Sequence, residues 1–317
     1  MDIATTRKYA SARISLPGTL ALALLVFIAG CGGASDESSY SDDMAEQHAD
    51  DSTQATAMVQ PPQMPVNGST ISYHTTEAGE TITGYFARPE SPDSVLEARG
   101  MDPATSALPG LLVIHEWWGL NDNIRGMARR LAGQGYQALA VDLYGTAPAE
   151  TPDQARGLMQ QAMQNPAFLM DNIAAAHLYL RQETGAPRVG VIGWCFGGGM
   201  ALNAAIAEPQ ELDAAAIYYG RVSNATEREL APIQMPIIGF FGGQDSSIPV
   251  EDVRQFEQTL NALGKDAEIY VYEDAGHAFA NPSGNNYAPE AAQDAWEKAM
   301  AFFDEALAPG NPTASAE

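Results

Sequence analysis

From about residue 110 onward, short apolar runs alternate with longer stretches of helical periodicity. Continuous apolar runs with helices between them are typical of a mainly parallel sheet whose strands are buried on both faces. The predicted strands are Gly110–Glu116, Gln137–Tyr144, Arg188–Cys195, Asp213–Tyr219, Pro236–Gly242 and Ala267–Tyr272. The predicted helices are Asn121–Ala132, Pro152–Gln164, Asp171–Gln182, Phe196–Ala207, Pro249–Leu263 and Pro289–Ala306. The pattern therefore predicts an α/β fold with a doubly wound sheet.

Two β-rich stretches precede this alternation. Ile71–Thr75 and Thr81–Arg88 are separated by Glu77-Ala78-Gly79-Glu80, which predicts an antiparallel pair at the sheet edge. A segment rich in Pro, Asp and Ser follows and is interpreted as a loop. We expect one domain over residues 68–308 and a flexible tail over residues 309–317, because α/β domains of this size commonly stay single.

The first thirty residues resemble an export signal. Arg7, Lys8 and Arg13 precede an apolar stretch that is too short for a permanent membrane span. It ends at Ile28-Ala29-Gly30-Cys31, which resembles a bacterial lipobox, so we expect acylation of Cys31 and anchoring to the cell envelope, in the periplasm or at the outer membrane. The alternative is an ordinary signal peptide with Cys31 incidental. Polar residues dominate 31–67 and predict a disordered tether.

Charge and cysteine usage narrow the function classes. The net charge is −24, and removing residues 1–30, with three basic residues and one acidic residue, leaves −26. Such a chain would be repelled by a phosphate backbone, so we expect no nucleic-acid partner. Cys31 and Cys195 are the only cysteines. With Cys31 acylated, Cys195 has no internal disulfide partner, and it is either an inert buried thiol or a reactive one.

Cys195 lies in a motif that favours the reactive interpretation. The predicted strand 188–195 runs into Gly193-Trp194-Cys195-Phe196-Gly197 and then into a predicted helix, in the form G-x-C-x-G. A nucleophile elbow needs small residues on both sides because its backbone is strained and closely packed. The start of the helix also favours a thiolate. A glycine-rich turn can instead hold a phosphate, but no G-x-x-x-x-G-K-S/T pattern is present.

A nucleophilic thiol requires a base and an acid, which follow it in α/β-hydrolases in the order acid, then histidine. His277 is the only histidine after Cys195, and it lies in a loop just past the last predicted strand. Asp245 ends the strand between them and is the predicted acid. Four other aspartates fit the position or the order less well, namely Asp142, Asp252, Asp266 and Asp274.

Glu116 ends the first predicted strand of the parallel sheet and is the fourth candidate catalytic residue. The pair His115-Glu116 suggests a metal site, but H-E-x-x-H fails because position 119 is Gly. The loop after this strand supplies an oxyanion donor in α/β-hydrolases. The backbone N–H groups of Trp117 and Phe196 are therefore the predicted oxyanion hole.

Together these motifs resemble the dienelactone hydrolase family over about residues 84–303. The motifs that carry the likeness are Glu116-Trp117-Trp118-Gly119-Leu120-Asn121, Val141-Asp142-Leu143-Tyr144, Gly193-Trp194-Cys195-Phe196-Gly197-Gly198, Tyr218-Tyr219-Gly220, Gly242-Gly243-Gln244-Asp245 and Ala275-Gly276-His277-Ala278-Phe279. The resemblance implies an α/β-hydrolase fold and a Cys-His-Asp triad that cleaves small-molecule esters or lactones. It also implies a glutamate, here Glu116, that pairs with the resting thiol and helps to deprotonate it, and neither a metal nor an organic cofactor.

Two departures from the family bear on the substrate. Members that open dienelactones hold the substrate carboxylate with two arginines, and this chain has Gly145-Thr146-Ala147 and Asn281 at those places. The departures favour neutral esters or lactones. The alternatives are a non-catalytic binding lipoprotein and a peptidase or acyl hydrolase of the same fold.

Overall fold

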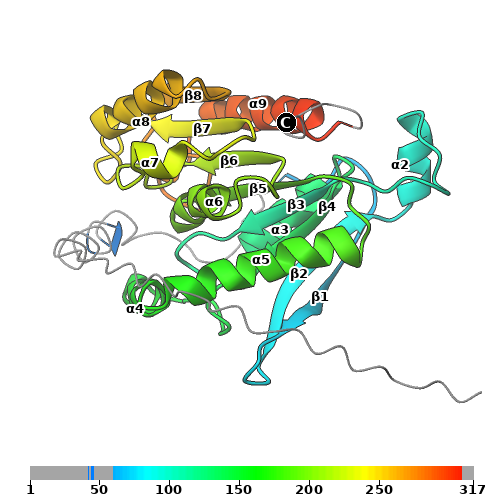
Figure 1. Cartoon of the computed structure of the whole chain (residues 1–317). Helices are drawn as coiled ribbons and strands as arrows, with labels where there is room; N and C mark the ends of the chain where they lie inside the picture. Colours follow the sequence, from blue (N-terminus) through cyan, green and yellow to red (C-terminus); the bar gives the residue numbers. More distant parts are fainter. Residues whose placement is uncertain (1–41, 43, 46–59, 309–317) are drawn as a thin grey trace, which may run out of the picture.

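A single eight-stranded sheet forms the centre of the computed structural model, which describes residues 42, 44, 45 and 60–308 (Figure 1). The strand order is β1-β2-β4-β3-β5-β6-β7-β8. The strands are β1 (Val66–Thr75), β2 (Thr81–Pro89), β3 (Gly110–Ile114), β4 (Gln137–Val141), β5 (Val189–Trp194), β6 (Ala214–Tyr218), β7 (Ile237–Gly242) and β8 (Ala267–Tyr272).

The parallel and antiparallel pairing of neighbouring strands agrees with the fold predicted from the sequence. β1 pairs antiparallel with β2, and β2 pairs antiparallel with β4, whereas all other neighbours are parallel. The predicted fold, a mainly parallel doubly wound sheet with an antiparallel N-terminal edge, is confirmed. Because β3, β5, β6 and β7 are parallel, their carboxyl ends share one edge of the sheet, where α/β proteins place their sites.

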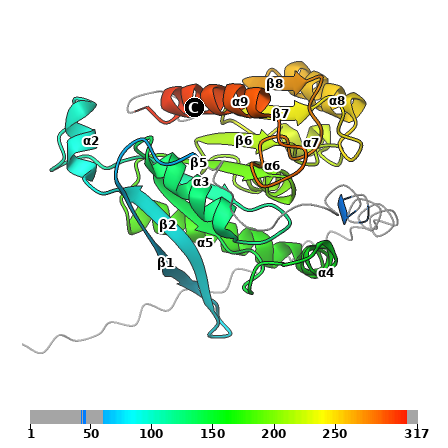
Figure 2. The same ribbon diagram turned by 180° about the vertical axis from the view of Figure 1, so that it is seen from behind.

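Helices cover both faces of the sheet. α5 and α6 lie on the face shown in Figure 1, and α3 and α9 lie on the opposite face, seen in Figure 2. The helices are α2 (Pro92–Ala98), α3 (Asp122–Ala132), α4 (Pro152–Met163), α5 (Pro166–Gln182), α6 (Phe196–Ala207), α7 (Glu227–Leu230), α8 (Val250–Ala262) and α9 (Pro289–Ala306). This layering buries the central strands completely.

Three helical predictions were wrong or incomplete. The loop predicted after residue 89 contains α2, which starts with Pro92 and Asp93, a common first-turn pair. α5 begins at Pro166, five residues before the predicted start, because the Asn165 side chain caps the backbone N–H of Phe168 at 3.3 Å. α7 was not predicted, although Thr226 opens a complete capping box.

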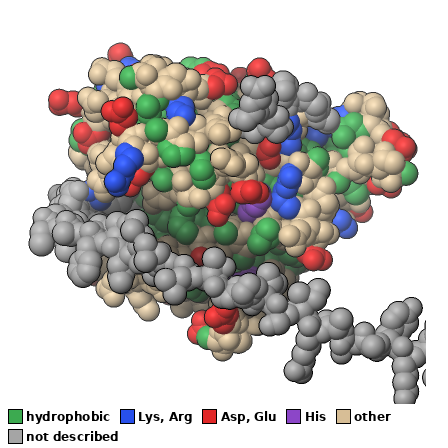
Figure 3. All heavy atoms as spheres, viewed as in Figure 1, with side chains coloured by type: hydrophobic (Ala, Val, Ile, Leu, Met, Phe, Trp, Pro, Cys, Tyr) green, Lys and Arg blue, Asp and Glu red, His purple; other side chains and the backbone are tan. Residues whose placement is uncertain are grey.

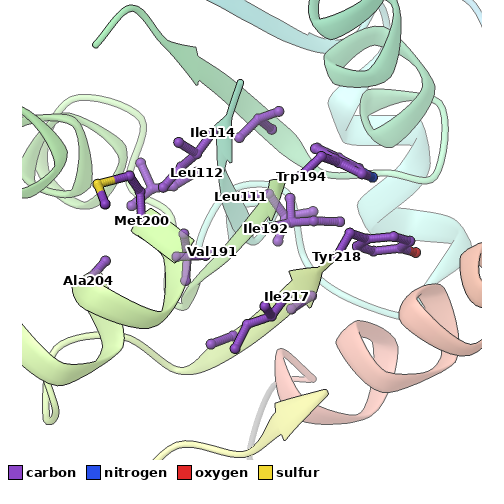
Figure 4. Packing of buried hydrophobic residues seen from close by; sticks show 14 of the residues in the cluster. Leu111, Leu112, Ile114, Val191, Ile192, Trp194, Met200, Ala204, Ile217 and Tyr218 are labelled. Atoms are coloured by element: carbon purple, nitrogen blue, oxygen red, sulfur yellow. The ribbon is translucent and has the colours of Figure 1, made fainter. Parts of the chain in front are cut away.

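The core supports the strand ends that carry the candidate site. Side chains of β3, β5 and β6 pack between the helix layers (Figure 4). Met200 and Ala204 of α6 lie over one face of the sheet, whereas Trp194 and Tyr218 extend together over the other, with ring centroids 5.4 Å apart. The carboxyl ends of β5 and β6 are therefore fixed by packing on both sides.

Several sequence-based expectations concern residues beyond the described part of the chain. The signal segment 1–30, Cys31, the tail 309–317 and most of the predicted tether lie outside the described residues. β1 begins at Val66, two residues before the predicted domain start.

Among the described helices, none combines the length and apolar character needed to cross a bilayer. On the face in Figure 3, acidic side chains are interspersed with Lys and Arg.

Candidate active site

Cys195 occupies the turn between β5 and α6. Its backbone has φ 55° and ψ −120°, a left-handed conformation that costs strain in any residue other than Gly. A Cβ at position 193 would lie 2.0 Å from the carbonyl oxygen of Gly197, and one at position 197 would lie 2.4 Å from that of Ile114. Only Gly fits at these two positions. The strained turn lifts the thiol above the sheet edge, as a nucleophile elbow requires.

The position of Cys195 also sets the electrostatics of its sulfur. Cys195 is the N-cap residue of α6, so it lies at the positive end of the helix dipole. A partial positive charge beside a thiol favours the thiolate, which is the nucleophilic form. Cys195 is the free cysteine within the described residues, and it is buried.

Asp245 and His277 come together on the other side of this edge. Asp245 follows β7, and its Oδ2 accepts a hydrogen bond from Nδ1 of His277 at 2.6 Å. Its Oδ1 accepts the backbone N–H groups of Ser247 and Ile248 at 2.9 and 3.0 Å. Both the Asp245 and His277 side chains are fully buried. The carboxylate therefore fixes the imidazole with Nε2 directed away from Asp245.

The His277 ring is electrostatically coupled to both partners. Burial by itself lowers the pKa of His277, but the negative charges of Asp245 and Cys195, and their hydrogen bonds with the ring, together raise the pKa well above the ordinary value of 6.5. The charged imidazolium is therefore favoured beside the Asp245 carboxylate and an ionised Cys195. The influence of Cys195 on the pKa of this ring indicates that the thiol lies within electrostatic reach of the imidazole.

Glu116 is a second buried carboxylate at the same edge, just past β3. Its Oε2 accepts the Asn281 side-chain amide at 2.7 Å, and its Oε1 accepts the Tyr219 hydroxyl at 3.4 Å. Burial, and then the charges of Glu116 and Cys195, raise the pKa of Tyr219 well above 10. Tyr219 therefore contacts Glu116 and lies within electrostatic reach of Cys195.

His115 has a structural role that the sequence did not reveal. Its Nε2 accepts the backbone N–H of Leu143 at 3.2 Å, so Nδ1 carries the proton and donates to the backbone oxygen of Glu116 at 2.6 Å. Burial lowers the pKa of His115, which favours this neutral form. The ring thus fixes the loop after β3 against the loop after β4.

The predicted oxyanion donors lie at the expected ends of their elements. Phe196 opens α6, and the first N–H groups of a helix have no partner within the helix. Trp117 is fully buried, with its ring centroid 4.9 Å from that of Trp118, and its carbonyl oxygen accepts the Tyr144 hydroxyl at 3.0 Å. Both backbone positions are therefore held by packing.

A residue of the N-terminal segment contacts the candidate nucleophile. Met44 is fully buried, and its Sδ lies 3.8 Å from Sγ of Cys195. Asp42 forms an exposed ion pair with Arg156 at 3.2 Å. Cys195 itself is 1% exposed, so the sulfur is covered when Met44 is in place. Nothing in the sequence pattern singled out Met44, because its contact partner is 151 positions away.

Three other residues of the site were not identified from the sequence. Tyr219 has φ 36°, and Asn123 and Ser283 form hydrogen bonds with Asn281 and each other. Tyr219 is the last residue of the predicted strand Asp213–Tyr219 and lies in the motif Tyr218-Tyr219-Gly220, and these were the available signals. Among the described residues, no group of three or more His, Cys, Asp or Glu side chains is arranged to hold a metal ion.

Comparison with known proteins identifies the family. The sequence pattern of the dienelactone hydrolase family matches residues 96–307. A candidate carboxymethylenebutenolidase of Salmonella typhimurium is 32% identical over 238 residues, which cover 71% of this chain and 83% of the relative. The chain belongs to the dienelactone hydrolase family. It is accordingly an ester or lactone hydrolase with an α/β-hydrolase fold.

Two further comparisons agree in extent. The protein usf of Aquifex pyrophilus is 34% identical over 206 residues, covering 63% of this chain and 89% of that protein. The crystal structure of a candidate dienelactone hydrolase from Klebsiella pneumoniae superposes with a TM-score of 0.65 and 27% identity, covering 76% of this chain and 99% of that one. The similarity thus spans most of the length of these relatives, whereas residues 1–95 and 308–317 are outside the family match.

Proposed function

We propose that this dienelactone hydrolase family member cleaves neutral esters or lactones through a covalent thioester on Cys195, with His277 and Asp245 as its triad partners. The observation that supports this best is the strained elbow at Cys195 opposite a buried Asp245–His277 pair joined at 2.6 Å. That arrangement supplies a nucleophile, a proton donor and a residue that orients the donor.

The acylation step follows from the charges at rest. The thiol proton passes to the Glu116 carboxylate, and the charges of Asp245 and of the resulting Cys195 thiolate raise the pKa of His277 and keep its ring protonated. The Cys195 thiolate attacks the carbonyl carbon, and the backbone N–H groups of Trp117 and Phe196 stabilise the oxyanion. As the tetrahedral intermediate collapses, the bond to the alkoxide oxygen breaks and His277 donates its proton to that oxygen. The product is an acyl thioester and an alcohol.

Deacylation restores the initial protonation states of His277, Cys195 and Glu116. The now neutral His277 takes a proton from water, and the hydroxide attacks the thioester carbonyl. Collapse releases the carboxylic acid and the Cys195 thiolate, which recovers its proton from Glu116. Asp245 holds the His277 tautomer and stabilises the imidazolium throughout, without itself becoming protonated.

Trapping of the intermediate tests this function. The wild-type enzyme is mixed with p-nitrophenyl acetate, a dienelactone and a chromogenic peptide, and intact-mass spectrometry follows the protein. We expect turnover of the ester, an acetyl adduct on Cys195 and inactivation by iodoacetamide. Cys195→Ala should keep the fold by circular dichroism and lose both turnover and adduct. Turnover that persists in Cys195→Ala would exclude Cys195 as the nucleophile, and turnover of the peptide alone would favour the peptidase alternative.

We also propose that the enzyme is exported and anchored by an acylated Cys31. The support is the basic start, the apolar core and the sequence Ile28-Ala29-Gly30-Cys31. Mass spectrometry of the N-terminal peptide should show a lipid-modified Cys31, and Cys31→Ala should leave the protein soluble or as an uncleaved precursor, with catalysis unchanged. An unmodified N-terminus at another residue contradicts the anchor.

A further inference from the structure

The Met44 side chain joins the N-terminal segment to the candidate nucleophile. Met44 is fully buried within the apolar core cluster, and the neighbouring Ala45 packs against that cluster while half-buried. Met44 Sδ lies 3.8 Å from Sγ of Cys195, which is direct contact between the two sulfur atoms. Met44 comes well before β1, which begins at Val66, so a segment outside the sheet makes this contact.

A second contact attaches the same segment to α4. Asp42 Oδ1 lies 3.2 Å from Nη1 of Arg156, whose Nη2 also pairs with Asp153 of α4 at 2.7 Å. In Figures 1 and 2 the segment, drawn in blue, lies beside α4. The Asp42 side chain is 62% exposed, and an exposed ion pair contributes little to stability. Burial of Met44 is therefore the main contact that holds the segment.

The covered state of Cys195 is incompatible with acylation. A reacting carbonyl carbon must come within about 3–3.5 Å of the nucleophile. Because Cys195 is 1% exposed, a substrate carbonyl reaches Sγ only if a covering side chain moves. Trp117 and His277 are held by hydrogen bonds within the domain. Met44 is held by apolar contact and by an exposed ion pair of its segment, so its movement costs least.

We propose that Met44 is an autoinhibitory plug, which occupies the position of the substrate acyl group above Cys195 and must leave before acylation. The inference rests on the proposed role of Cys195 as the nucleophile. A methionine side chain is unbranched and uncharged, and its thioether offers a thiolate no carbonyl to attack. The plug therefore blocks the sulfur without being consumed, and the position that it fills suits a neutral, unbranched acyl chain.

A plug slows every reagent at Cys195 by one common factor. Only the open fraction of the enzyme reacts, so the rate constant for iodoacetamide and kcat/KM for any ester are multiplied by that fraction. Saturating substrate holds the enzyme open, so KM changes while kcat stays constant. A methionine that instead formed a permanent wall of the acyl site would affect small and large substrates by different factors.

Substitutions at Met44 measure this factor in the full-length enzyme. Alkylation by iodoacetamide and hydrolysis of p-nitrophenyl acetate and p-nitrophenyl butyrate are followed at one pH. Met44→Leu keeps the apolar bulk and should stay within about 2-fold of wild type. Met44→Ala should accelerate all three reactions several-fold. Met44→Gln should accelerate them by about 10-fold, because an amide without a partner is costly to bury in an apolar site.

A matched control comes from the same part of the chain. Met64 also precedes β1 but lines a separate surface pocket beside α2, so Met64→Gln should match wild type in all three reactions. Wild-type rates in both Met44→Ala and Met44→Gln would overturn the plug, and so would factors that differ between acetate and butyrate. Alkylation that follows the series while neither ester acylates Cys195 would uphold the covering role of Met44 and overturn the proposed nucleophile.

The ion pair with α4 gives an independent measurement. Asp42→Asn removes the charge that pairs with Arg156, and kcat/KM should rise by up to about 2-fold. Added salt should raise kcat/KM of wild type because it screens the same pair, and Asp42→Asn should lose this response. Asp153→Asn removes the other partner of Arg156 and should not raise kcat/KM. An identical salt response in wild type and Asp42→Asn would overturn the attachment through Arg156.

Discussion

Two buried carboxylates lie at the same edge of the sheet as Cys195, and they are held in different ways. Asp245 and Glu116 are equally inaccessible, each at 4% exposure. Asp245 accepts two backbone N–H groups two and three positions ahead in the chain, in addition to His277. Glu116 accepts hydrogen bonds from the side chains of Tyr219 and Asn281, which are 103 and 165 positions away.

The difference indicates a division of tasks. A carboxylate bound by its own backbone turn cannot reorient without breaking local structure, which suits a residue that only orients a histidine. A carboxylate held by side chains can rotate or accept a proton at lower cost, which suits a proton acceptor. Four experiments test this comparison.

The largest effect is expected at Asp245. Asp245→Asn keeps the shape and the backbone hydrogen bonds but favours the wrong His277 tautomer, so kcat/KM should fall by about 10⁴-fold with the fold retained. Steady-state kinetics and circular dichroism measure both. Asp142 is a matched control, because its Oδ1 also accepts two backbone N–H groups after a strand, at 3.1 and 2.9 Å. Asp142→Asn should stay within a few-fold of wild type, and an equal loss in both variants would refute a special role for Asp245.

Glu116→Gln should have the next largest effect. The amide preserves volume and removes basicity, so single-turnover acylation should slow by about 10²–10⁴-fold, the usual range for a general base. The melting temperature should stay nearly constant or rise, because a buried charge has been removed. A wild-type acylation rate would place Glu116 outside the mechanism and leave Asp245 as the sole functional carboxylate.

The pH dependence of stability should differ between two buried histidines. His277 has a raised pKa in the folded state, so the stability it contributes is complete below pH 6.5 and is lost as pH rises through that raised value. The melting-temperature difference between wild type and His277→Gln should therefore shrink from pH 6.5 to 9, by about 2–4 °C per kcal/mol.

His177 is the matched control for this measurement. Burial, and then the charge of Arg181, lower the pKa of His177. Its neutral form is favoured in the folded state, so wild type should lose stability relative to His177→Gln as pH falls below 6.5. Parallel trends in the two variants would contradict the opposite charge states that we assign to these rings.

The smallest effect is expected from Met44. Met44→Ala removes the side chain that covers Cys195 Sγ, so alkylation by iodoacetamide should accelerate several-fold at constant pH. Met64→Ala provides a control, since Met64 lines a separate surface pocket beside α2. Identical alkylation rates in wild type and Met44→Ala would show that Met44 does not limit access to the sulfur.

Sequence patterns predicted the strands better than the helix starts. Every predicted strand is present, because a run buried on both faces is apolar along its whole length. The start of α5 was missed because it depends on one capping residue, Asn165, rather than on periodicity. α7, with four residues, is too short to show a period.

The sequence also predicted some residues of the candidate site and missed others. Chain order was enough to select His277 and Asp245, because strand ends of a parallel sheet converge. Position 281 was noticed only as a departure from the family, and its function as a donor to Glu116 depends on an amide orientation set by Ser283. Asn123 and Met44 reach the site through contacts across more than 150 positions, which no local pattern encodes.

If Cys31 carries a lipid, the contact of Met44 with Cys195 also limits the distance between the active site and the membrane. Met44 follows Cys31 by thirteen positions, which span at most about 45 Å when fully extended. Val66, where the sheet begins, follows Cys31 by thirty-five positions, or at most about 120 Å. If Cys31 is the lipid anchor, the contact of Met44 with Cys195 Sγ keeps this sulfur within about 45 Å of the bilayer. Without the Met44 contact, the limit for such an anchor would be the roughly 120 Å set by Val66.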